Sequence, residues 1–182
     1  MATIQKPYTL IEDFVTGQQV PNVGAEANRQ AMEKVLVQEK GFLKSDIEVD
    51  AAIEVTIAGE PYESRIDLVV STNGQRIMAI KCAAGSLSSR EREIVAAARL
   101  IDTCQIPLAV VSDGAQAIVL DTLTGKKISD GMDAVPTKAQ AVQLLKDAEP
   151  VAFPENKRER EKLVFRTYDI ENVNVRRNIV SG

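Results

Sequence analysis

Asp67 and Lys81 are the two residues of this sequence best suited to chemistry. Asp67 stands inside the apolar run 65–70 and Lys81 inside the apolar run 77–82, on either side of an Asn73-Gly74 turn. A carboxylate can ligate Mg²⁺ and a lysine can orient the attacking water, and together these are the parts of a metal-dependent phosphodiester hydrolase. Such a site usually has a second acid two residues before the lysine, where this sequence has Ala79.

The register of the predicted hairpin decides whether the two side chains meet. A two-residue Asn73-Gly74 loop would pair Asp67 with Ile80 and turn Lys81 to the opposite face. A three-residue loop would pair Asp67 with Ala79 and put Lys81 on the same face. A shared site therefore requires an odd-length loop or a β-bulge.

The sequence before this hairpin predicts one helix and one strand. Residues 24–39 have helical spacing, with Glu26, Gln30 and Glu33 on one face of the helix. Residues 47–57 alternate as a half-buried strand, or as two strands with a break after residue 50. The hairpin itself then supplies strands over 62–70 and 75–82.

The sequence after the hairpin predicts two helices and two strands. A capping-box pattern at 88–91 opens a helix that runs to about Cys104. Strands at 107–112 and 115–121 are joined by Asp113-Gly114, and a second capping box at 137–140 opens a helix to about Asp147. The order predicts an α/β fold with a mixed β-sheet of about five strands flanked by helices on both faces.

Composition narrows the possible chemistry. The 182 residues include no histidine, which excludes Ser-His-Asp catalysis and histidine-ligated zinc. The two cysteines, Cys82 and Cys104, are too few and too far apart for a zinc site of the CxxC type. Net charge is −4, divided into −6 over residues 1–154 and +2 over residues 155–182. An acidic body disfavours tight, non-specific DNA binding.

Domain organisation and location follow from the same features. No run of about 18 apolar residues is present, so we expect no membrane contact. The first 15 residues lack the apolar core of a signal peptide, so a cytoplasmic location is expected. Pro150 and Pro154 divide the chain into a domain over 1–149 and a C-terminal extension over 150–182. We expect the extension to be helical and either to cover the core or to exchange with a second copy.

A resemblance to a known family rests on several short segments in order. Together they resemble the N-terminal nuclease domain of type I restriction enzyme R subunits, within the PD-(D/E)XK superfamily. The similarity spans about residues 20–149, and the segments that carry it are 26–30, 39–42, 65–70, 79–82, 99–107 and 110–114. The resemblance implies a restriction-endonuclease-like fold, Mg²⁺ as the cofactor of an active enzyme and DNA as a partner.

The resemblance also implies roles for three residues. Asp67 would be a metal ligand, and Lys81 would be the catalytic lysine. Glu26 would be the helix carboxylate that leans over the site in many relatives. Each has a simpler interpretation as well, because Asp67 and Lys81 would make a structural ion pair and acids such as Glu26 are common in the first turn of a helix.

Ala79 is the departure from the family pattern. A methyl group cannot ligate magnesium, so the metal site loses an anionic ligand. Some relatives supply the missing acid from the following helix, where Glu91 and Glu93 are the candidates. Glu91 belongs to the predicted capping box, so Glu93 is the preferred metal ligand.

Two functions from different classes follow. The first is a Mg²⁺-dependent DNA endonuclease in which Glu93 replaces the missing acid. The second is a nuclease-fold domain without catalysis, which binds DNA or a partner protein. A carboxylate from the helix after residue 88, placed beside Asp67 and Lys81, would favour a working site.

Overall fold

The computed structural model describes the backbone of residues 8–180 and the side chains of residues 8–170. Residues 1–7 of the predicted domain and residues 181–182 of the predicted C-terminal extension lie outside the described residues. The helices are α1 (Glu26–Lys34), followed by a π-helical turn (Val35–Glu39), α2 (Glu91–Leu100), α3 (Lys138–Asp147) and α4 (Glu155–Val180). The strands are β1 (Leu10–Glu12), β2 (Gln19–Pro21), β3 (Ile47–Ile57), β4 (Glu60–Thr72), β5 (Gln75–Cys82), β6 (Leu108–Ser112), β7 (Ala117–Asp121) and β8 (Lys126–Asp130).

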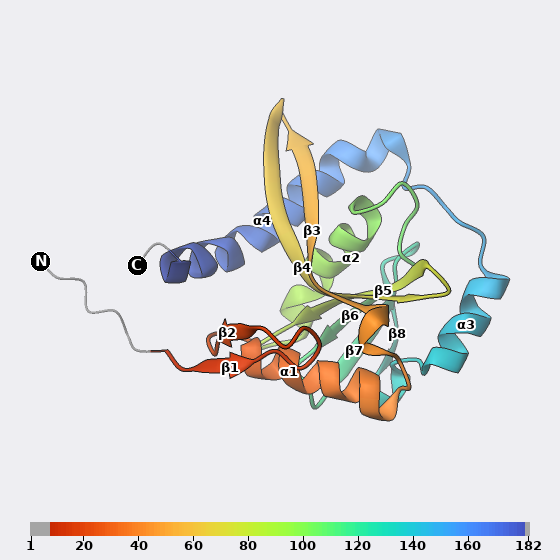
Figure 1. Cartoon of the computed structure of the whole chain (residues 1–182). Coiled ribbons are helices and arrows are strands. Elements are labelled where there is room, and N and C mark those ends of the chain that lie inside the picture. The colour runs from red at the N-terminus through yellow and green to blue at the C-terminus, as the bar shows by residue number, and fades with distance from the viewer. Residues whose placement is uncertain (1–7, 181–182) are drawn as a thin grey trace, which may run out of the picture.

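Six strands form one mixed sheet in sequence order, β3-β4-β5-β6-β7-β8. Only β5 and β6 run parallel, and α2 is the crossover between them. The other neighbours are antiparallel hairpins. Strands β1 and β2 pair separately beside α1 (Figure 1).

Helices cover both faces of the sheet. On one face, Met32 and Leu36 of the first helical segment pack with Leu68, Ile80 and other buried residues. On the opposite face, α2 packs over Val69 and Ala79, and α4 adds Phe165 to the same core. The long hairpin of β3 and β4 extends beyond the rest of the sheet, and α4 runs alongside it and α2 (Figure 1). The predicted mixed α/β fold flanked by helices is therefore confirmed.

The sheet has six strands where the sequence predicts about five, and the strand that was not predicted is β8. All five residues of Lys126–Asp130 are exposed, so the strand has no apolar face for a sequence pattern to reveal. Its pairing with β7 at the edge of the sheet defines it instead. Exposed lysines are typical of edge strands, which avoid pairing with other molecules.

The start of α2 also differs from the sequence prediction. Residues 88–90 form a 3₁₀ turn, Arg90 is the N-cap, and no side chain caps the helix. The capping box predicted at 88–91 is wrong, and the helix ends at Leu100 rather than near Cys104. The box at 137–140 is confirmed, because Gln140 N donates to the Thr137 hydroxyl and Thr137 N donates to Gln140 Oε1.

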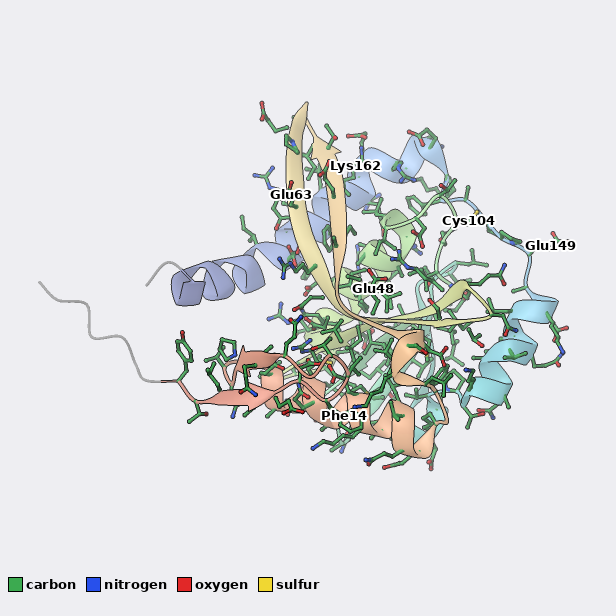
Figure 2. All side chains as sticks on the ribbon, viewed as in Figure 1. Phe14, Glu48, Glu63, Cys104, Glu149 and Lys162 are labelled. Carbon is green, nitrogen blue, oxygen red and sulfur yellow. The ribbon has the colours of Figure 1, made fainter. Side chains whose placement is uncertain are left out.

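The C-terminal extension begins with the chain that leads into α4. Figure 2 shows Cys104 beside this chain, and Cys104 forms a β-bridge with Ala152. Phe165 is buried against the core of α2 and β3. Within residues 8–180, no helix is both long enough and apolar enough to span a membrane.

Candidate functional site

The hairpin of β4 and β5 brings Asp67 and Lys81 together through a β-bulge. Asn73 and Gly74 form a two-residue turn, both with positive φ (52° and 74°), as a type I′ turn requires. The register then shifts by one residue between Val70 and Ser71. Of the two alternatives open from the sequence, the bulge is the one that occurs.

The shift sets which residues oppose each other farther along the hairpin. Val69 pairs with Ala79 and Leu68 with Ile80, so one further step opposes Asp67 to Lys81. Opposed residues of antiparallel strands share a face. Both charged side chains therefore point to the face that α2 covers.

Lys81 lies between two carboxylates. Its Nζ is 3.6 Å from Asp67 Oδ2 and 3.2 Å from Glu93 Oε1. All three side chains are buried, with 7%, 4% and 3% of the surface of Lys81, Asp67 and Glu93 exposed. The structure thus brings three sequence-predicted site residues into one cluster, which we call the lysine cluster.

Backbone and neighbouring side chains hold the two acids of the lysine cluster in place. Asp67 Oδ2 accepts a 2.8 Å hydrogen bond from Cys82 N, so its carboxylate continues the pairing of β4 with β5. Glu93 lies in the first turn of α2, and Arg90 Nη1 is 3.3 Å from its Oε2. Glu91, the other candidate, is only partly buried. Burial raises the pKa of Glu93, Lys81 opposes this rise, and the charge of Asp169 adds to it.

Helix α4 covers the lysine cluster. The Tyr62 hydroxyl donates a 2.7 Å hydrogen bond to Asp169 Oδ2, and Asp169 is buried. Arg90 Nη1 also reaches the carbonyl of Tyr168, at 3.4 Å. Sequence reasoning did not identify Asp169, although Phe165 lies four residues earlier on the same helix face and marks that face as buried.

Glu26 belongs to a different charged group, which we call the arginine cluster. Arg29 Nη2 is 2.7 Å from Glu26 Oε1 and 3.1 Å from Asp13 Oδ2, and Arg29 Nη1 is 3.7 Å from Glu33 Oε1. The Gln30 amide also donates to Glu26 Oε1, at 2.8 Å. Glu26 is therefore held by residues of its own helix, which covers the other face of the sheet from α2.

The arginine cluster fastens the loop between β1 and β2 to α1. Phe14, labelled in Figure 2, donates its backbone N–H to Gln30 Oε1 at 2.7 Å, and Val15 N donates to Glu33 Oε2 at 3.2 Å. Burial raises the pKa of Glu33 to about 7, and the nearby charge of Asp13 contributes to the rise. The shared helix face of Glu26, Gln30 and Glu33 is visible in the sequence, and Arg29 is the structural partner of these acids, as its place among them in the sequence suggests.

The two clusters differ from an ordinary metal site in their donor sets. Each has a cationic side chain among its carboxylates, and Ala79 is a fully buried methyl group. Within the part of the chain that the structure describes, no three Asp, Glu or Cys side chains converge so that they could hold a metal ion. The donor set around Lys81 is therefore two carboxylates that share one ammonium group.

The fold and the lysine cluster define an α/β protein with a buried lysine–carboxylate group on adjacent strands. Residues 24–136, more than half of the chain, match the family described as Type I restriction enzyme R protein N terminus (HSDR_N). The chain belongs to this family. No similar curated protein and no similar solved structure was found.

Proposed function

We propose that this chain is a DNA-associated domain of the PD-(D/E)XK nuclease type that does not hydrolyse DNA. Membership in a family of restriction enzyme R proteins supports the link to DNA. Asp67 on β4 and Lys81 on the adjacent β5 support the nuclease ancestry, because a PD-(D/E)XK site has its acid and lysine in this order on two neighbouring strands.

The position of Lys81 carries the proposal that catalysis is absent. Its ammonium group neutralises Asp67 and Glu93 at 3.6 and 3.2 Å, in the place where a metal ion would have to bind both carboxylates. Magnesium keeps several water ligands, whereas the side chains of this cluster have almost no contact with solvent. Ala79 removes the remaining anionic ligand. Lys81 therefore has a structural partner role in place of a catalytic one.

Two assays test the proposal. Wild type and Lys81→Ala are incubated with supercoiled plasmid in Mg²⁺ or Mn²⁺, and we expect no cutting by either protein. Wild type is then titrated against a fluorescent DNA duplex at low salt, and we expect binding that weakens as salt is added. Cutting by wild type that Lys81→Ala lacks overturns the absence of catalysis. Failure to bind DNA overturns the association with DNA and favours a protein-interaction domain.

A second candidate function is a Mg²⁺-dependent DNA endonuclease. The position of Glu93 favours it, because this carboxylate comes from the helix after β5 and lies beside Lys81 and Asp67. Activity would require the Lys81 ammonium group to leave the space between the two carboxylates. The same plasmid assay decides, since a nuclease of this kind loses cutting on Glu93→Gln and a non-catalytic domain has none to lose.

A further inference from the structure

A groove separate from both charged clusters lies between α2, α4 and the turn that joins β7 to β8. Its volume is about 450 Å³. Its apolar part is formed by Leu123, Val151 and Val164, and basic residues from α2 and α4 line it as well. Helices α2 and α4 lie side by side along this part of the molecule (Figure 1).

Three exposed cations line the groove. They are Arg92 of α2 and Lys157 and Arg160 of α4. None of the three forms an ion pair with a side chain of residues 8–170. Their charges are therefore available to a ligand from solution.

The other charged pair in the groove is already satisfied. Arg99 Nη1 is 2.9 Å from Glu161 Oε1, and Arg99 also donates to the carbonyls of Thr122 and Leu123. Arg99 and Glu161 neutralise each other, so the three exposed cations give the groove its net positive charge. Arg99 also lies over the ring of the buried Phe153, with 5.2 Å from Cζ to the ring centroid.

We propose that this groove binds the phosphate backbone of nucleic acid. The proposal rests on the DNA association proposed above and names the surface responsible for it. Residues 1–154 carry a net charge of −6, which disfavours DNA binding by the body as a whole, so a local group of cations is needed where phosphates approach. A guanidinium group such as that of Arg92 or Arg160 can donate two parallel hydrogen bonds to the oxygens of one phosphate.

The lining of the groove also predicts how DNA is read. Phe153 is the groove's aromatic residue, and it is buried beneath Arg99, so bases find no exposed ring to stack on. Contacts to phosphates fix position without reading sequence. Binding in this groove is therefore expected to be independent of sequence and strongly dependent on salt.

The test compares the wild type with a groove variant, Arg92→Gln/Lys157→Gln/Arg160→Gln. Binding to a labelled duplex of random sequence is measured by fluorescence anisotropy over a series of salt concentrations. Each lost phosphate contact lowers the slope of log K against log salt by about 0.9, so the groove variant should lose roughly two to three units of slope. Its Kd should rise at least about tenfold at low salt.

A matched control separates the groove from overall charge. Lys34→Gln/Arg65→Gln/Lys146→Gln also removes three positive charges, but from exposed positions outside the groove, on α1, β4 and α3. We expect its Kd to change less than about threefold. Circular dichroism melts check that both triple variants remain folded, and Arg92→Lys/Arg160→Lys, which keeps the charges, should retain most of the affinity.

The outcomes distinguish this inference from the proposed function. If wild type binds DNA and the two triple variants weaken binding equally, the groove is not the contact surface, while the DNA association stands. If wild type does not bind DNA at all, both proposals fail. If the groove variant loses binding to an oligoglutamate peptide and keeps its DNA binding, the groove is a site for acidic peptides instead.

Discussion

Replacing Lys81 by methionine should lower the free energy of unfolding by about 3–5 kcal/mol at pH 7, the usual cost of removing one partner from a buried ion pair. Methionine fills most of the space of the lysine stem, so the loss of charge dominates the effect. Asp67 keeps its hydrogen bond from Cys82 N and Glu93 keeps Arg90, but the shared cation of the two carboxylates is gone. A lysine in a hydrated catalytic site would have no such cost.

The effect of pH follows from Glu93. Burial already raises its pKa, and the loss of Lys81 removes a charge that opposes the rise, so the pKa of Glu93 increases further in the variant. A carboxyl group with a raised folded-state pKa stabilises the fold when it is protonated, and stability decreases as pH rises through that pKa. The penalty of Lys81→Met should therefore be smaller at pH 5 than at pH 7.

Urea unfolding followed by circular dichroism measures this prediction. Wild type, Lys81→Met, Glu93→Gln and the double variant form a double-mutant cycle at each pH. We expect Lys81→Met to cost clearly less in the Glu93→Gln background, because only one of the two buried carboxylates, Asp67, then loses its cation. Lys126→Met, at an exposed position on β8, is the control and should change stability by less than about 0.5 kcal/mol. A loss below about 1 kcal/mol for Lys81→Met, or an equal loss in both backgrounds, would refute the structural role of Lys81.

Three further predictions concern the supporting structure. The folded-state pKa of Glu33 is about 7, against an ordinary value of 4.5. The contribution of Glu33 to the free energy of unfolding is therefore most favourable below pH 4.5 and declines by roughly 3 kcal/mol as pH rises through 7. Glu33→Gln should flatten the pH dependence of urea stability between pH 5 and 8, and an unchanged profile would count against the shift. In thermal melts, Gly114→Ala should cost about 2–5 kcal/mol, because φ is +88° and the added Cβ would lie 2.5 Å from a side-chain carbon of α1. The control Gly17→Ala, with φ of +71° and open space around it, should cost only about 1–2 kcal/mol. Tyr62→Phe should cost about 1–3 kcal/mol because the buried carboxylate of Asp169 loses a hydrogen bond, and a cost that is unchanged in the Asp169→Ala background would contradict this.

Local sequence chemistry predicted much of the fold. The Asn73-Gly74 turn and the capping box at Thr137 were predicted correctly, because a few adjacent residues determine each of them. The edge strand β8 was missed because its five residues are all exposed and have no apolar face. The β-bulge between Val70 and Ser71 was left open, since residues 66–70 and 77–82 beside it are buried on both faces and the alternation that would reveal a slip is absent.

The candidate site was predictable only where its parts are close in sequence. Asp67 and Lys81 belong to one hairpin, and Glu93 follows twelve residues later on the next helix. Asp169 of α4 lies far along the chain from the rest of the site. It is held there by a hydrogen bond from Tyr62 that no local sequence pattern predicts. Glu26 was assigned to the catalytic set by resemblance, whereas the structure shows it bound to Arg29.

Manganese binding tests the central claim most directly, because Mn²⁺ takes the same oxygen ligands as Mg²⁺ and is visible by electron paramagnetic resonance. Wild type and Asp67→Asn are titrated with Mn²⁺ at pH 7. If the ammonium group of Lys81 occupies the place of the metal, wild type and Asp67→Asn should show the same weak, non-specific uptake. A site in wild type that binds one Mn²⁺ per chain and disappears in Asp67→Asn would contradict the claim and favour the endonuclease.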